Sequence, residues 1–373
     1  MLYGNGIQDD TPALQALLDS GNRYVEFPMP AVCYAISRPL QIHSGQELSL
    51  PRYCHIRLLP DSNCAMLENK DPQAGDSHIT VRGGIWDLNN LQQGKNPIHF
   101  GNPDVFMGYS KMYRGIVFDF FHVKHLNLSD FTIKDPVTFG VVLNRVSYFT
   151  VENVEFDYNY GNPWAVNMDG IHLSGECSHG VIRNLKGACY DDMVALNADE
   201  DVPGAICDIL IDGLFAENSH SAVRLLSADY PVKNVTIRHV FGTFYQYCIG
   251  ITKYYEGENG YFDGIVLDGI FASKAERLPV YGKDGTFVYP LIWVQEGLKV
   301  KNLCIRNVHR QEAVTAVETI GIVKGASIDV LSISHIFQSS PAHLSFPLLH
   351  NQGEVKQCHK DMLCSECGEL ETS

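Results

Sequence analysis

The chain has 373 residues, a length that fits either two average domains or one elongated repeat domain. Hydrophobic residues make up 45% of it and charged residues 19%, which excludes an intrinsically disordered chain because enough apolar surface is available for a core. The 28 Lys and Arg against 43 Asp and Glu give a net charge of -15, which repels phosphate backbones and argues against a nucleic-acid partner.

The sequence shows no pattern for membrane insertion or export. No stretch reaches the roughly 18 to 20 apolar residues that span a bilayer. The first residues, from Met1 to Asn5, lack the basic start and the apolar run of a signal peptide. We therefore expect a cytoplasmic protein without a membrane partner.

The first predicted element is a helix over residues 11–20, which has a proline in its first turn and is followed by Gly21. Asp10 or Thr11 is expected to accept the first free backbone amides of this helix. Its apolar stripe consists of Leu14, Leu17 and Leu18. We expect the helix to cover the first turn of the following domain, as part of an N-terminal cap formed by residues 1–28.

A long loop is predicted from Asn89 to Arg114. This region is rich in Asn, Gln, Gly, Lys and Tyr and has no regular periodicity. Long loops on a rigid scaffold often carry binding residues, so we expect it to line a binding groove.

The centre of the chain is built from a repeated unit, a short β-rich run with Asn, Asp or Gly before its last apolar residue. These last positions, 23 to 38 residues apart, are Phe131, Val154, Leu185, Leu214, Val240, Ile270, Val308 and Ile336. Strands repeated at such a period, with almost no helical pattern, predict a solenoid, and the Leu-x-x-Leu-x-Leu segments of leucine-rich repeats are missing. We expect an all-β, single-stranded right-handed parallel β-helix over residues 29–345, followed by a Cys-containing tail over residues 346–373.

The 11 cysteines do not form a disulfide framework, because most are scattered without short fixed spacings. Reduced, buried thiols are the expected state. In the tail, Cys358, His359, Cys364 and Cys367 are close enough to suggest a metal site. A closed zinc site normally needs two well-separated ligand pairs, so we expect no metal there.

Acidic residues and a histidine recur on successive turns of the predicted solenoid. Asp169 and Asp191 are 22 residues apart, one turn, which would place them one or two strand spacings of ~4.8 Å from each other. Asp192 follows directly, and His220 comes one turn later. Neighbouring residues of a strand face opposite sides, so one Asp of the pair could instead cap a turn. We favour a functional cluster, in which repulsion raises one carboxyl pKa, as a general acid needs, while the others activate water.

These segments resemble the polygalacturonase family, glycoside hydrolase family 28, of the pectin-lyase-like β-helix class. That family carries Asn-Thr-Asp, Asp-Asp, Gly-His-Gly and Arg-Ile-Lys in this order. The matching segments here are Asn167-Met168-Asp169, Asp191-Asp192, Ser219-His220-Ser221 and Ile251-Thr252-Lys253. The start of the chain, residues 4–15, is similar to the cap of the same superfamily, so the resemblance covers most of residues 1–345.

The chain departs from the family at two places. Both glycines around the His are serines, and Ile251 stands where the family has an Arg, which the resemblance implies grips the substrate near the cleaved bond. The missing guanidinium removes a bidentate contact to a carboxylate, so a short or neutral glycan is an alternative to galacturonan. Arg224 is a candidate replacement for that cation, against the simpler interpretation as a solvated surface residue.

The leading hypothesis is a glycosidase that acts on plant-wall oligosaccharides and, as the resemblance implies, inverts the anomeric centre. Asp191 is expected to be the acid, Asp169 and Asp192 to hold the water, and His220 to tune the charge of the acid. For an inverting acid and base we expect carboxyl groups about 6.5 to 9.5 Å apart. The expected substrate-binding residues are Asn167, Arg224, Lys253, Tyr254 and Tyr255. No cofactor or metal is expected, and a homo-oligomer remains open.

Two alternatives stay open. A lyase of the same fold would need a basic group to abstract a proton and usually a calcium site; the acids here suit calcium, but the sequence places no Arg or Lys in the cluster itself. A non-catalytic glycan-binding β-helix would leave the acids without a reaction, and it fits poorly with a chain that is expected not to be exported.

Overall fold

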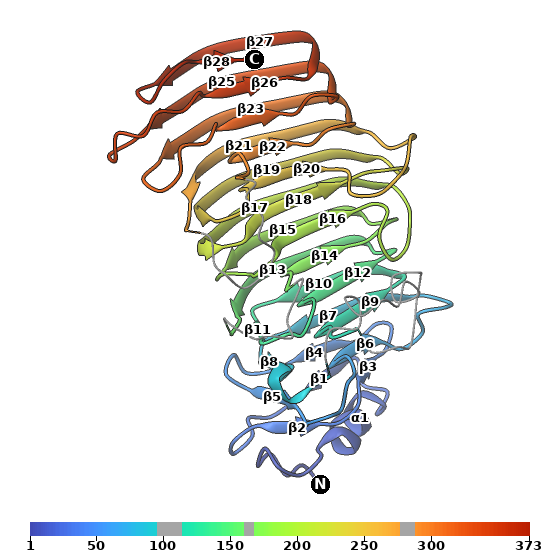
Figure 1. The fold of residues 1–373 in the computed structure, drawn as a ribbon. Helices are drawn as coiled ribbons and strands as arrows, with labels where there is room; N and C mark the ends of the chain where they lie inside the picture. The colour runs from blue at the N-terminus through green and yellow to red at the C-terminus, as the bar shows by residue number, and fades with distance from the viewer. Residues whose placement is uncertain (95–113, 160–167, 277–287) are drawn as a thin grey trace.

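The computed structural model describes residues 1–94, 114–159, 168–276 and 288–373. It is a right-handed parallel β-helix in which the chain winds upward from the N-terminal end, rung upon rung (Figure 1). Within the described residues, the strands form two parallel sheets of 16 and 12 strands, called sheet A and sheet B here. The predicted fold class is therefore confirmed.

Sheet A carries the longer strands of each rung. Its path runs through β1 (Tyr24–Glu26), β4 (Glu47–Ser49), β7 (Asp76–Arg82), β10 (Val123–Ser129), β13 (Ser147–Asp157), β15 (Ser178–Lys186), β17 (Ile206–Ser219), β19 (Val232–Phe244), β21 (Phe262–Lys274), β23 (Lys299–Gln311), β25 (Ser327–Ser339) and β27 (Glu354–Ser365). A side branch of the same sheet joins β13 and consists of β2 (Tyr34–Ile36), β5 (His55–Leu58), β8 (Ile85–Asp87) and β11 (Thr132–Lys134).

Sheet B carries the shorter strands and, as shown below, the candidate site. Its strands in stacking order are β3 (Leu40–Ile42), β6 (Leu67–Asn69), β9 (Phe118–Phe121), β12 (Val141–Asn144), β14 (Ile171–Leu173), β16 (Asp192–Asn197), β18 (Ser221–Leu226), β20 (Ile249–Thr252), β22 (Ile292–Val294), β24 (Ile320–Ile322), β26 (Leu349–Asn351) and β28 (Glu371–Thr372).

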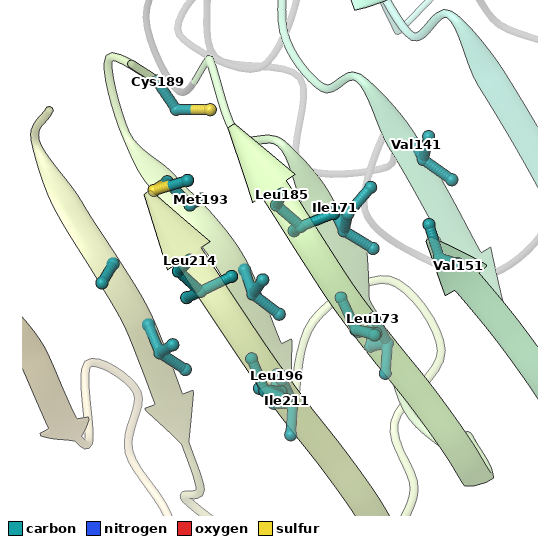
Figure 2. Close-up of a cluster of buried hydrophobic side chains, with 14 of the residues drawn as sticks. Val141, Val151, Ile171, Leu173, Leu185, Cys189, Met193, Leu196, Ile211 and Leu214 are labelled. Carbon is teal, nitrogen blue, oxygen red and sulfur yellow. The ribbon is translucent and has the colours of Figure 1, made fainter. Parts of the chain in front are cut away.

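The core fills the space between the two sheets. Alternate residues of each strand point inward, and these positions carry Val, Ile and Leu, as in Ile171 and Leu173 of β14. Figure 2 shows such side chains meeting the inward residues of the neighbouring rungs, among them Leu185 and Leu214 of sheet A. The outward residues between them are left free to form a site.

The repeat positions of the sequence form one column inside sheet A. Leu214 is the register partner of both Leu185 and Val240, and the column continues through Ile270 and Val308. All of these side chains are buried. The apolar residue that ends each unit is therefore the residue that stacks on its equivalent one rung away, as the period predicted.

The N-terminal cap differs from the prediction in detail. Helix α1 (Thr11–Leu18) buries Leu14 and Leu18 against the first rungs, as expected. Asp10 does not cap it with its side chain, because its backbone is already helical; its carboxylate instead accepts amides of the N-terminal segment and of Ala35. A short 3-10 helix, η1 (Asn90–Gln92), opens the predicted loop, whose remainder at 95–113 lies outside the described residues. Within the described residues no helix has the length and apolarity to cross a bilayer.

The segment over residues 346–373 is not a separate tail. Its strands β26, β27 and β28 add a further rung, and β27 pairs with β25 along most of its length. Cys358 stacks on the inward Leu331, whereas Cys364 stacks on the outward Phe337, so the two thiols face opposite sides of the strand.

Candidate active site

The predicted acids converge at one edge of sheet B. Asp169 lies just before β14, Asp192 is the first residue of β16, and His220 lies just before β18. These three strands are neighbours, and Asp192 is in register with Ser221, the residue after His220. Because parallel strands begin at the same edge of a sheet, the three side chains share one place on the outer face.

Asp169 is a fully buried carboxylate held by two donors. Its Oδ2 lies 2.7 Å from Nδ1 of His172, and its Oδ1 accepts the backbone N–H of Asp192 at 3.2 Å. Burial, reinforced by the charge of Asp192, raises the pKa of Asp169 well above its usual range. Because of this raised pKa, the carboxyl groups of the cluster share a proton.

Asp192 is buried but has a cation beside it. Its Oδ1 accepts the hydroxyl of Ser221, and its Oδ2 forms an ion pair with Nε of Arg224 at 2.9 Å, although the N–H does not point along a hydrogen-bond direction. Burial raises the pKa of Asp192, while Arg224 and Ser221 act in the opposite direction. These two partners favour the ionised form of Asp192.

Asp191 is the acid of the cluster that keeps contact with solvent. Its side chain is 13% exposed, whereas the side chains of Asp169 and Asp192 are fully covered. Its Oδ1 lies 3.3 Å from Nδ1 of His220. Burial and the charges of Asp192 and Asp169 raise the pKa of Asp191 well above its usual range. The geometry therefore offers a protonated acid that can reach a ligand.

The Asp pair faces one side because Asp191 precedes the regular strand that Asp192 begins. Ligand atoms of Asp191, Asp192 and His220 lie within 4.8 Å of one another, so these groups could share a cation. Arg224 already supplies positive charge to Asp192, and we assign no metal. The nearest oxygens of the two acids are thus closer than the about 6.5 to 9.5 Å expected between acid and base.

Two members of the site escaped the sequence interpretation. These residues are His172 and Glu200. Asn197 donates to Oε2 of Glu200 and lies 3.4 Å from Nε2 of His172, linking the two. The phenol of Tyr255 donates to Oε1 of Glu200 at 2.7 Å. The acid-rich run directly after β16 was the available signal for Glu200.

Arg224 corrects the expectation that no Arg or Lys lies in the cluster. It is a buried, outward-facing residue of β18, not a solvated surface residue. Besides Asp192, it reaches Oε2 of Glu200 at 3.8 Å and lies 5.5 Å from the ring centroid of Tyr254. Burial lowers and the two carboxylate charges raise the pKa of Arg224, with a net increase well above its usual value.

The fourth motif segment begins at a core position. Ile251 is buried in the core and pairs with the inward Leu225, so a charged residue of an alternating Arg-Ile-Lys motif would stand at the outward positions 250 and 252. Those positions hold Gly250 and Thr252, and neither is a cation. Arg224 is the register partner of Gly250 on the preceding rung.

The remaining predicted binding residues fall into three groups. Tyr254 and Tyr255 are half-exposed and border the cluster through Arg224 and Glu200. Lys253 lies just past β20, where its backbone N–H donates to Gln295, and its charge acts on the exposed Asp229. Asn167 lies outside the described residues.

Comparisons with known proteins identify the fold. No protein-family model and no curated protein match the chain. The Family 28 exopolygalacturonase of Yersinia enterocolitica is similar, with a TM-score of 0.63 at 13% identity over 96% of this chain and 76% of that one. The endo-xylogalacturonan hydrolase of Aspergillus tubingensis gives 0.58 at 15% over 100% and 98%. PfbA, a surface adhesin of Streptococcus pneumoniae, gives 0.53 at 13% over 100% and 91%.

At these identities the comparisons establish a shared parallel β-helix fold. Two of the three similar structures are hydrolases by name and one is an adhesin. A fold of this kind supports more than one activity, so the reaction must be argued from the side chains.

Proposed function

We propose that the protein is a glycoside hydrolase that cleaves oligosaccharides, related in mechanism to family 28. The observation that carries the proposal is the convergence of Asp169, Asp191, Asp192 and His220 from adjacent rungs. Carboxyl groups in different environments are what acid and base catalysis of glycoside cleavage needs. The resemblance to the family motifs and the hydrolases of the same fold support this interpretation.

The roles follow from exposure and charge. Asp191 is the general acid, because it keeps access to solvent and its raised pKa keeps a proton on it. Asp169 and Asp192 hold the water, and Arg224 favours the ionised form of Asp192 that this role requires. His220 lies beside the carboxyl oxygen of Asp191 and adjusts the charge of this acid.

The stereochemistry needs its own measurement, because the close approach of Asp191 and Asp192 is nearer to the about 5 to 5.5 Å of retaining enzymes than to the inverting range. Proton NMR of the first product formed identifies its anomer directly. We expect inversion, as the resemblance to family 28 implies. A product of retained configuration would make Asp192 a nucleophile and Asp169 a supporting residue.

The activity is tested with the purified protein and defined oligosaccharides from pectin and other plant walls, read by new reducing ends. We expect release from at least one substrate, and loss of it in Asp191→Asn. Asp361→Asn serves as the matched control, since Asp361 is exposed on β27, in the last rung of the solenoid. Equal activity in wild type and Asp191→Asn would contradict the assignment.

A glycan-binding protein without catalysis is the second candidate. Two observations favour it: Asp169 and Asp192 are fully buried, and an adhesin shares the fold. Binding of an oligosaccharide with no product from any substrate would establish it. The lyase is less favoured, because Arg224 is held as a cation and cannot accept a proton. An ultraviolet-absorbing unsaturated product would reverse that order.

A further inference from the structure

The charge of Arg224 is matched inside the protein. Its Nε lies 2.9 Å from Asp192 and its Nη2 lies 3.8 Å from Glu200, and all three side chains are buried. Removing the guanidinium would leave these carboxylates buried without a counter-ion. Arg224 therefore already has carboxylate partners within the protein in the absence of a ligand.

The described part of the next rung places no cation in register with Arg224, because its Lys253 lies past the end of β20 and its charge acts on the exposed Asp229. The outward residue of this rung in register with Arg224 is Gly250, and a Cβ atom there would lie 2.5 Å from the ring of Tyr247. The space that a side chain at residue 250 would need is thus filled by a buried phenol ring. Tyr247 in turn stacks on Trp293 with ring centroids 5.7 Å apart, so the side of the site beyond Arg224 is aromatic.

The position beside Arg224 is surrounded by negative charge. Within the parts of the chain that the structure describes, the cluster acids contact the imidazole rings of His172 and His220 and form ion pairs with Arg224. A bound carboxylate would add an anion beside the ionised Asp192, where burial and the charges of neighbouring acids already raise the pKa of Asp191. An uncharged sugar avoids that repulsion, and its C–H faces suit the exposed ring of Tyr254.

We infer that the sugar unit bound beside Arg224 is neutral, and that Arg224 is a positioning residue, the internal counter-ion of Asp192 and Glu200, and not an anchor for a uronate. This inference rests on the proposed function for the site, and it narrows the substrate class to neutral or esterified glycans. It also assigns a purpose to Gly250, whose missing side chain lets Tyr247 close the aromatic side.

The test is a binding titration by calorimetry on Asp191→Asn, which leaves the charge of Arg224 in place. The ligands are matched pairs: aryl galactoside and galacturonide, aryl glucoside and glucuronide, and oligogalacturonides with free and methyl-esterified carboxyls. We expect the neutral member of a pair to bind at least about tenfold more tightly. A uronate bound as tightly as its neutral partner, or no binding by any compound, would overturn the inference. Neutral binding without hydrolysis by wild type would sink the hydrolase proposal and leave this one standing.

Variants of Arg224 separate a counter-ion from a uronate anchor. In Arg224→Met the ionised form of Asp192 loses its partner, so the pKa of Asp192 should rise. The acidic limb in a plot of neutral-ligand binding against pH should therefore move to higher pH, and Arg224→Lys should restore it. An anchor would show the opposite pattern: an unchanged profile with neutral ligands and a selective loss of uronate binding in Arg224→Met. The conservative Lys variant keeps the test valid where the Met variant does not fold.

Discussion

His172 lies 2.7 Å from Asp169, with Nδ1 facing the carboxylate oxygen, and both side chains are buried. Burial lowers the pKa of His172 to about 4, so the ring is neutral at neutral pH. A neutral ring carries one proton, and with this proton on Nδ1 the ring donates to Asp169 while Nε2 faces the amide of Asn197. The ring thus donates to Asp169 without carrying charge.

This arrangement predicts that His172 destabilises the folded state at acidic pH. Between about pH 6.5 and 4 the unfolded chain protonates His172 and the folded one does not, so stability is lost as pH falls, by about 3 kcal/mol in this window. His172→Gln should be less stable at pH 7 but should lose less between neutral and acidic pH. The raised pKa values of the nearby acids act with the opposite sign in both proteins, so the comparison isolates the ring. Urea unfolding at both pH values measures it; equal losses would contradict the neutral ring.

The pH dependence of the reaction follows from Asp191. Its pKa is raised, so the proton needed for general acid catalysis stays bound above the usual range of a carboxyl group. We expect kcat/KM to fall as pH rises through this pKa, and to fall again at low pH as Asp192 becomes protonated. A profile of kcat/KM against pH checks this. A rate that only rises with pH would show that the ionised form of Asp191 is the active one.

The fold was predictable because every rung of the solenoid has to meet the same packing requirement. Each unit must place an apolar residue inward at the same point, so positions such as Leu185, Leu214 and Val240 are visible in the sequence and stack in the structure. The last rung was missed because its inward positions include the exposed Cys358 and Lys360, which dilute the apolar alternation.

The site was predictable for residues that recur with the period of the rungs, and not for residues whose positions do not follow this period. Asp169, Asp191 and His220 stand at strand starts, so counting rungs brings them together. Glu200 comes from a loop after β16, and loop geometry has no period. Arg224 lies inside a strand, where its direction depends on the register of β18 with its neighbours.

The core column predicts the effect of truncation. Leu214 is fully buried between Leu185 and Val240, so Leu214→Ala should lower the free energy of unfolding by about 2 to 5 kcal/mol. Phe215 is the matched control: it is the next residue, faces outward and stacks on Phe241 at 5.1 Å. Phe215→Ala should cost about 0.5 to 1.5 kcal/mol. Chemical denaturation compares them, and a larger effect for Phe215 would show that the inward face is misassigned.

The role of Asp191 predicts a dependence on the leaving group. Asn at this position keeps the size of the side chain but cannot deliver a proton, so cleavage of natural glycosides should fall by roughly two to four orders of magnitude. A dinitrophenyl glycoside that fits the site needs little protonation, so Asp191→Asn should retain much more of its rate on that substrate. Initial rates on both substrates measure the difference.

Asp192→Asn and Asp169→Asn are the controls for this experiment, because activating the water is needed whatever the leaving group. Each should lose similar activity on the natural and the dinitrophenyl substrate, and circular dichroism should show that the β-helix is intact. If Asp192→Asn showed the selective rescue and Asp191→Asn did not, the two residues would exchange roles. If none of the three substitutions changed hydrolysis, the buried carboxylates would not be catalytic, and the cluster would serve ligand binding alone.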